Sequence, residues 1–344
     1  MRDIATPGHG VMVPAAAFRR PGLRERRSSL PLARDASRPL RIGLLNNMPD
    51  AAFLATERQF RRLIESEAEL HLFTIGDMPR GAEAHSHIER FYSPHTALAA
   101  AGLDGLVVTG CEPRAPRLEA EPYYGAFAAV VDWAAEHTVS TVFSCLAAHA
   151  AVLHLDGIER RRLPLKSWGV FPCSAAAVHP LLAGLPASTA VPHSRWNDLA
   201  ESDLAAQGYT VLRRSERAGV DLFVHDGRSL LVFLQGHPEY DEDSLAREHR
   251  REMGRFLDGT RPTCPPLPEN YYTAEAEERL DAFAALADTQ RDPALQAAFP
   301  DLAAVPPLPA AWRDPAARLF RNWLALVARR RAGLRPPSRR LRIS

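Results

Sequence analysis

The sequence of 344 residues predicts an α/β protein in which a mostly parallel sheet is flanked by helices. Three observations lead to this class. Short apolar and β-branched runs alternate with stretches of helical length in the first half, the most reactive side chains directly follow such runs, and turn residues separate shorter runs in the second half. The first pattern is typical of a flavodoxin-like parallel sheet, and the last favours antiparallel additions to it.

Expected strands and helices alternate along the first half of the chain. The strands are expected at residues 40–46, 70–75, 105–110 and 140–143, and the helices at residues 55–64, 122–137 and 146–151. Ligands of such sheets bind beyond the carboxyl ends of the strands. Gly110, Cys145 and His237 all fall at such ends, so we expect a site there.

The second half is expected to add shorter antiparallel strands and two helices. The strands are expected near residues 209–213, 220–225 and 230–234, and the helices at Ser244–Leu257 and residues 315–328. Asp314 is placed to cap the last helix, and Pro315 suits its first turn. The proline-rich stretches 262–268 and 306–309 are interpreted as extended connections within one domain.

Composition and charge exclude several classes of protein. A hydrophobic content of 46%, a charged content of 24% and a net charge of +1 are ordinary for a soluble globular protein and give no reason to expect nucleic acid or a membrane as a partner. No secretory signal and no membrane-spanning run is apparent. The four cysteines, Cys111, Cys145, Cys173 and Cys264, lie far apart with no C-x-x-C pair. This spacing argues against a zinc site and against a disulfide framework, and a reducing cytoplasm is expected.

The chain is interpreted as one domain with two extensions. Residues 1–38 are rich in Arg, Pro, Ala and Ser without periodicity and are expected to be a flexible extension. Residues 39–330 form the single domain, and residues 331–344 form a basic C-terminal tail.

Cys145 is the first candidate for a reactive residue. It stands between an expected strand and an expected helix, where the helix directs N–H groups and its positive dipole end at the thiol and so favours the nucleophilic thiolate. His237 and Glu239 follow another expected strand and offer a base and a carboxylate that orients it. A buried structural cysteine and a surface His–Glu pair are the alternatives.

Lys166 is the second candidate, because lysine is otherwise absent from the sequence. The chain has 42 Lys and Arg residues, of which only Lys166 is a lysine. Because only lysine provides a compact ammonium, we expect Lys166 to lie in a pocket that excludes a guanidinium. Chance survival of a single lysine is the alternative.

Several segments together resemble one enzyme family. They are residues 44–49, 55–60, 108–110, 166–170, 192–195, 236–241, 269–272 and 322–324, together with the segment around Cys145. Among them, Asn-x-Met-Pro and Pro-His-Ser-Arg are not shared by ordinary glutamine amidotransferases. Over roughly residues 40–330 the chain resembles the homoserine O-succinyltransferases (homoserine transsuccinylases), which have a class I glutamine-amidotransferase-like fold.

The resemblance implies a cysteine acyltransferase. Cys145 would accept the acyl group, His237 would be the general base and acid, and Glu239 its orienting carboxylate. The Leu146 amide is the natural first oxyanion donor. Lys166, Ser194 and Arg251 match positions that contact substrate in the family, although a mixed-charge helix face explains Arg251 equally well.

The same resemblance implies the substrates and the setting. It implies L-homoserine as acceptor, acyl-CoA as co-substrate with no bound cofactor, methionine biosynthesis, the cytoplasm and a homodimer. The acyl donor stays open, because Arg114 stands where the family has Gly or Glu, and Leu146 and His149 stand where Trp and Gln are usual. Charge complementarity between Arg114 and a carboxylate favours succinyl over acetyl. A related hydroxy amino acid as acceptor, a glutamine-amidotransferase-like hydrolase and an inactive relative are the alternatives.

Overall fold

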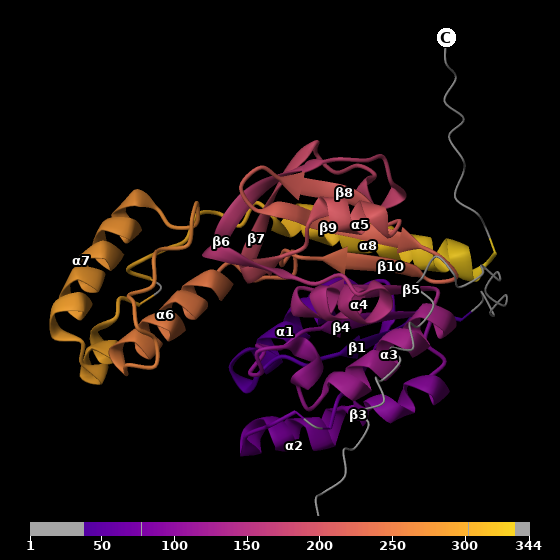
Figure 1. Cartoon of the computed structure of the whole chain (residues 1–344), viewed down its shortest axis with the longest axis horizontal. Helices are drawn as coiled ribbons and strands as arrows, with labels where there is room; N and C mark the ends of the chain where they lie inside the picture. Colours follow the sequence, from indigo (N-terminus) through magenta and orange to yellow (C-terminus); the bar gives the residue numbers. More distant parts are fainter. Residues whose placement is uncertain (1–37, 77, 302, 334–344) are drawn as a thin grey trace, which may run out of the picture.

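The computed structural model describes residues 38–333 with the exception of 77 and 302, and the structural statements below concern that part of the chain (Figure 1). The expected N-terminal extension, residues 1–38, and the basic tail, residues 331–344, lie almost wholly outside the described residues. None of the described helices is long and apolar enough to cross a membrane.

One sheet of ten strands runs through the described part of the chain, in the order β3-β2-β1-β4-β5-β10-β9-β8-β6-β7. The strands are β1 Arg41–Leu45, β2 Glu69–Thr74, β3 Ser93–Pro94, β4 Gly105–Thr109, β5 Ser140–Ser144, β6 Arg161–Ala175, β7 Ser188–Asp198, β8 Thr210–Ser215, β9 Gly219–Asp226 and β10 Leu230–Leu234. The α-helices are α1 Asp50–Ile64, α2 Ala82–Phe91, α3 Tyr124–His137, α4 Leu146–Asp156, α5 Glu201–Ala206, α6 Ser244–Leu257, α7 Ala274–Gln290 and α8 Arg313–Arg331. Short 3-10 helices are η2 His95–Ala100, η3 Leu118–Ala120, η4 Pro180–Leu182 and η5 Pro293–Ala298.

The sheet has two halves that differ in strand direction. Neighbouring strands from β3 to β10 are parallel, and those from β10 to β7 are antiparallel. The predicted α/β class, with a parallel sheet flanked by helices and antiparallel additions in the second half, is confirmed. The parallel connections bring the ends of β4, β5 and β10 side by side, because β5 pairs with both β4 and β10.

Helices cover both faces of the parallel half, which explains its apolar strands. Leu44 packs in the cluster formed with α1 and α8, and its neighbour Leu45 packs in the cluster formed with α3 and α4. Successive strand residues point to opposite faces, so a strand buried on both sides must be apolar throughout. A third cluster joins α6 and α7 to β6 through residues that include Trp168, Phe256 and Phe283. These two helices project from one end of the sheet, on the left of Figure 1.

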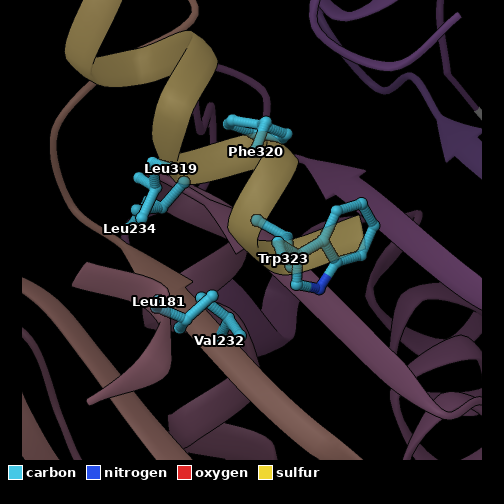
Figure 2. Close-up of a pocket in the computed structure, with 7 residues that line it drawn as sticks. Leu181, Val232, Leu234, Leu319, Phe320 and Trp323 are labelled. Carbon is cyan, nitrogen blue, oxygen red and sulfur yellow. The ribbon is translucent and has the colours of Figure 1, made fainter. Parts of the chain in front are cut away.

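The contact between α8 and the sheet leaves a small apolar cavity (Figure 2). Its volume is about 10 Å³, and it is lined by Val142, Leu181, Val232, Leu234, Leu319, Phe320 and Trp323. A buried water needs about this much space and two to four polar partners, which this lining does not offer. Beside it, Trp323 Nε1 donates a hydrogen bond to Ser140 Oγ over 2.9 Å, so the buried indole is satisfied. The cavity is a packing gap rather than a binding site.

Some elements have no counterpart among the expected ones. Helices α2 and α7 were not expected from the sequence, and neither were β6 and β7, the longest pair of strands in the sheet. Pro164 and Pro172 lie within β6, and proline removes a ladder donor. The structure accommodates Pro164 because pairing with β7 is interrupted between Arg162 and Ser167.

The expected cap of the last helix was wrong. α8 begins at Arg313, one residue before Asp314, and the residue at the N-cap is Trp312. Asp314 therefore lies in the first turn, where its carboxylate still faces the positive end of the helix dipole. The α6 bounds, Ser244–Leu257, agree with the expected ones.

Asp104 anchors the two ends of the described chain to the sheet. Its fully buried carboxylate accepts hydrogen bonds from Arg38 at 2.9 Å, from the Arg41 amide at 3.0 Å and from Arg331 at 3.1 Å. Replacing Asp104 by alanine should lower the free energy of unfolding by about 3–5 kcal/mol, because the Arg331 guanidinium would stay buried without its counter-charge. Urea denaturation followed by circular dichroism measures this change.

An exposed ion pair provides the matched control. Arg41 Nε and Glu69 Oε2 lie 3.3 Å apart with both side chains more than 40% exposed. Glu69→Gln should cost less than about 1 kcal/mol, because solvent screens the pair. Equal losses for the two variants would contradict the structural role of Asp104.

Candidate active site

Cys145 occupies a sharp turn between β5 and α4. Its backbone has φ 53° and ψ −114°, a left-handed conformation that non-glycine residues adopt at a cost of order 1–3 kcal/mol. The Cys145 amide donates to the Leu234 carbonyl at 2.7 Å, which fixes the turn to the end of β10. This strand–turn–helix geometry is that of a nucleophile elbow, in which the reactive side chain stands above the end of the sheet. Its side chain is partly exposed, and substrate therefore has access to it.

His237 and Glu239 follow the next strand of the sheet and form a buried pair. His237 Nδ1 and Glu239 Oε1 lie 2.8 Å apart, and the two residues are 5% and 3% exposed. The His237 amide donates to the Pro192 carbonyl at 2.7 Å, and Ser144 Oγ donates to Glu239 Oε1 at 3.4 Å. The imidazole is therefore held from β7 and from β5. With Nδ1 turned toward the carboxylate, Nε2 is left for the side-chain hydrogen bond with Cys145.

The charges around His237 favour its protonated form. Burial alone would lower the pKa of the imidazole, but the Cys145 and Glu239 charges and hydrogen bonds outweigh it and raise the pKa well above the ordinary value. The structure thus brings the three residues predicted from strand ends into one contiguous group. The arrangement suits nucleophilic catalysis with an imidazole that holds and returns a proton.

The first turn of α4 contains the backbone amide that is expected to be an oxyanion donor. Among the described residues no acceptor takes the Leu146 amide, which lies next to Cys145 at the helix N-terminus. Gly110 approaches this turn from the end of β4: a Cβ on Gly110 would come within 2.5 Å of Leu146 Cβ and 2.8 Å of the Ala147 nitrogen. Only glycine permits this contact.

Lys166, the one lysine of the sequence, lies in a cluster of charged side chains near the candidate catalytic residues. Lys166 Nζ contacts Glu248 Oε1 of α6 at 2.5 Å and lies 4.3 Å from the centre of the Trp168 ring. Ser194 of β7 donates to the same carboxylate oxygen. The Lys166 side chain is 9% exposed, so it lies in a buried setting rather than on the surface. It comes from the irregular part of β6, where pairing with β7 is interrupted.

Glu248 carries the negative charge of this cluster. Burial raises the pKa of its carboxyl, but the Lys166 charge, hydrogen bonds from Lys166 and Ser194 and the Arg251 charge outweigh burial and lower it. Glu248 was missed from the sequence because it belongs to a helix face of mixed charge. Its position three residues before Arg251, on the same face of a helix, is the signal that could have drawn attention to it.

Arg251 and Arg255 approach from the next turns of α6. Arg251 Nε lies 4.0 Å from Glu252 Oε1. Arg255 binds both carboxylate oxygens of Glu112, at 3.1 and 3.0 Å, and joins α6 to the loop that follows β4. The Arg255 hydrogen bonds are the largest cause of a lowered pKa at Glu112, with further contributions from Arg251 and Lys166. The loop after β4 and the Lys166 cluster are thus electrostatic neighbours.

Arg114 is not part of this cluster in the structure. It lies exposed on the loop after β4, and its backbone amide donates to Glu121 Oε1 at 2.5 Å. Its guanidinium forms no hydrogen bond or ion pair with another described residue, so its donors are available to a ligand. The structure therefore brings together all the predicted site residues except Arg114.

A second polar group lies directly behind His237. Cys173, His193 and Asp221 are fully buried, and each places one potential metal ligand within 4.8 Å of the others. Arg213 Nε already pairs with Asp221 at 2.5 Å. Burial raises the pKa of Asp221, but the Arg213 charge outweighs it and lowers the pKa. Gly236 abuts this group, since a Cβ there would come within 2.5 Å of Asp221 Oδ1. The group supports the segment that carries His237.

Comparison with proteins of known structure gives distant matches. A glutamine amidotransferase from Thermotoga maritima is 13% identical, with a TM-score of 0.47, and the match covers 85% of this chain and 99% of that chain. A glutamine amido transferase from Methylobacillus flagellatus is 15% identical, with a TM-score of 0.47, over 84% and 94% of the two chains.

Sequence comparison gives much stronger matches. The family model described as homoserine O-succinyltransferase matches residues 27–332. A homoserine O-succinyltransferase of Methylorubrum extorquens is 60% identical over 330 residues, which are 96% of this chain and 98% of that protein. One of Rhodopseudomonas palustris is 50% identical over 85% of this chain and 90% of that protein. The chain therefore belongs to the homoserine O-succinyltransferase family.

Proposed function

We propose that the protein transfers a succinyl group from succinyl-CoA to the side-chain hydroxyl of L-homoserine through an acyl-enzyme on Cys145. The observation that carries this proposal is the contiguous group of Cys145, His237 and Glu239 at neighbouring strand ends, with the thiol accessible from solvent. Family membership supports the reaction, and the geometry supports the route.

The first step transfers the acyl group to sulfur. The Cys145 thiolate attacks the thioester carbonyl, and the resulting oxyanion is stabilised by the Leu146 amide. As the tetrahedral intermediate collapses, the bond to the coenzyme A sulfur breaks, and the coenzyme A thiolate leaves with the proton held by His237. The raised pKa of His237 supports this role, because the free enzyme then holds the required proton.

The second step transfers the acyl group to the acceptor. Acylation removes the negative charge from Cys145, which is one of the causes of the raised His237 pKa. The imidazole therefore becomes a better proton acceptor at the stage where a base is needed. Neutral His237 takes the proton of the homoserine hydroxyl, whose oxygen attacks the thioester carbonyl. Sulfur leaves as thiolate, and the imidazolium is restored.

The charged cluster offers partners for both ends of an amino acid. Lys166 and Arg251 would hold the acceptor carboxylate, while Ser194 and Glu248 offer a hydroxyl and a carboxylate for its ammonium group. The free guanidinium of Arg114 would pair with the succinyl carboxylate in a bidentate manner. Lys166 already has its counter-charge in Glu248, 2.5 Å away, so the buried ammonium is paired before substrate arrives.

Arg114 gives a direct test of donor choice. Replacing Arg114 by glycine should raise KM for succinyl-CoA, with a loss in kcat/KM of about 10- to 150-fold, because a charge-assisted hydrogen bond is worth about 1.5–3 kcal/mol. The use of acetyl-CoA, which has no carboxylate to bind, should change little. Coenzyme A release with each donor and L-homoserine measures both.

The same assay provides a matched control and shows which results would contradict the proposal. Arg117 lies three residues away and pairs on the surface with Glu119 at 3.0 Å, so Arg117→Gly should change neither donor. Unimpaired use of succinyl-CoA by Arg114→Gly would remove Arg114 from the proposal. A wild-type preference for acetyl-CoA would identify the protein as an acetyltransferase, and ammonia release from glutamine would identify the hydrolase alternative.

Family membership supports a further inference, about the place of the reaction in the cell. The proposed product, an O-succinyl amino acid, would serve methionine biosynthesis in the cytoplasm. The homodimer implied by the family also stays a prediction, which sedimentation of the purified protein would test.

A further inference from the structure

Tyr240 has no part in the mechanism above, yet its ring lies against the catalytic imidazole. The ring centroids of His237 and Tyr240 are 4.2 Å apart, and the two planes are inclined by 16°, so the rings are stacked. The stacking joins residues three positions apart in the turn after β10. The Tyr240 amide closes this turn by donating to the His237 carbonyl at 3.2 Å.

The backbone at Tyr240 is also bonded by residues from distant parts of the chain. The buried Trp312, just before α8, donates from Nε1 to the Tyr240 carbonyl at 2.9 Å. Arg62 of α1 donates to the neighbouring Glu239 carbonyl at 3.1 Å. The tyrosine backbone is therefore fixed by its own turn and by two helices from opposite ends of the sequence. Because its backbone is fixed in this way, Tyr240 keeps its ring against the imidazole.

The charged neighbours of His237 interact with its ring nitrogens, whereas the face of its ring is covered by the uncharged Tyr240 ring. Cys145 and Glu239 interact with the two nitrogens of His237, and the nearby His193 of β7 adds a Coulombic interaction. Burial, followed by the charges of Glu248, Glu239 and Cys145, raises the pKa of Tyr240 well above the ordinary value, and Arg251 opposes this. The phenol therefore stays neutral, and its ring presents a π face to the imidazole.

We propose that Tyr240 is a positioning residue for His237: its ring holds the imidazole in the plane that joins Cys145 to Glu239, and its π face stabilises the imidazolium. The inference rests on the proposed role of His237 as the proton carrier. Aromatic faces attract cations, most strongly where water is excluded; His237 is 5% exposed, and Tyr240 is partly buried. A planar neighbour also prevents the imidazole from turning its nitrogens away from their partners.

The test compares a variant that keeps the ring with one that removes it. Both are made in a Cys145→Ala background, so that His237 titrates without a coupled thiol. Tyr240→Phe keeps the stacked ring and removes the hydroxyl, whereas Tyr240→Leu removes the π face. The pKa of His237 is measured by NMR of histidine-labelled protein, with a Cys145→Ala, His237→Gln protein to assign the resonance.

The expected result is a pKa lower by about 0.4–1.5 units in Tyr240→Leu, the shift that corresponds to a cation–π interaction of partly to fully desolvated groups. Tyr240→Phe should titrate like the parent. An unchanged pKa in Tyr240→Leu would overturn the proposal, as would an equal fall in both variants, because the hydroxyl would then be responsible. If Tyr240→Leu does not fold, Tyr240→Met provides the same comparison with a flexible side chain.

Turnover with Cys145 intact provides the second readout. Tyr240→Leu should lower kcat by about 10- to 100-fold through misplacement of the imidazole, with a smaller change in the KM of either substrate. Tyr240→Phe should keep most of the activity. The titration does not depend on acyl transfer, so failure of the acyl-enzyme route and failure of the Tyr240 proposal are distinguishable.

Discussion

Replacing Cys145 by alanine is expected to lower kcat/KM for acyl transfer by at least about four orders of magnitude. The acyl group must be bonded to sulfur between the two steps, and alanine offers no atom to carry it. Cys145→Ser should also lose most activity, because an alcohol is far less ionised than a thiol at neutral pH. Release of coenzyme A in the presence of L-homoserine measures both variants.

The backbone conformation at residue 145 does not disturb the comparison of the alanine and serine variants with the wild type. Cys145 has a positive φ of 53°, and alanine and serine carry the same Cβ in that conformation, so neither adds backbone strain that cysteine lacks. Cys264→Ala is the matched control, since that half-buried thiol lies in the extended connection after α6. It should keep near-complete activity. Product formation by Cys145→Ala at the wild-type rate would contradict the acyl-enzyme route.

Replacing His237 by glutamine should lower kcat by about 10²–10⁴-fold, the usual contribution of a positioned acid and base. Both steps lose their proton carrier, because glutamine has no ring nitrogen in the place of the one that faces Cys145. Wild-type turnover should fall as pH decreases through the His237 pKa of the acyl-enzyme, since the hydroxyl step needs neutral imidazole. The profile of kcat against pH in the variant should lack this inflection.

Glu239→Gln is a milder variant that leaves His237 in place. Glutamine keeps the size of the side chain but removes a charge that raises the pKa of His237. The pKa should therefore fall, and the inflection in the pH profile should move to lower pH. The loss of orientation should still reduce kcat. An unchanged pH profile in both variants would show that His237 is not the titrating base.

The positions of Cys145, His237 and Glu239 at strand ends could be predicted from sequence, because a short apolar strand precedes each of the two segments. β5 and β10 are buried on both faces, and the same pattern that buries them places Cys145 and the His237 segment at their ends. Parallel pairing of β5 with β10 then brings the two ends together, although the residues lie far apart in the chain. The order of the strands in the sheet therefore brings Cys145 and His237 together, which their spacing in the sequence does not predict.

The Lys166 cluster was harder to predict because its strands carry weak signals. β6 includes two prolines and an interruption in pairing, so neither an alternating nor a continuous apolar pattern reveals it. Glu248 lies among five other charged or polar residues in 247–252, which is also the pattern of a solvated helix face. Packing of α6 against β6, which buries one side of that helix, is a tertiary effect that local sequence does not contain.

Intact-protein mass spectrometry after mixing with succinyl-CoA alone tests the central claim most directly. Without L-homoserine the second step cannot proceed, so we expect the protein to gain the mass of one succinyl group, located on the peptide that contains Cys145. Addition of L-homoserine should remove that mass and yield the O-succinyl product. A protein that forms product while its Cys145 peptide never gains mass would contradict the account.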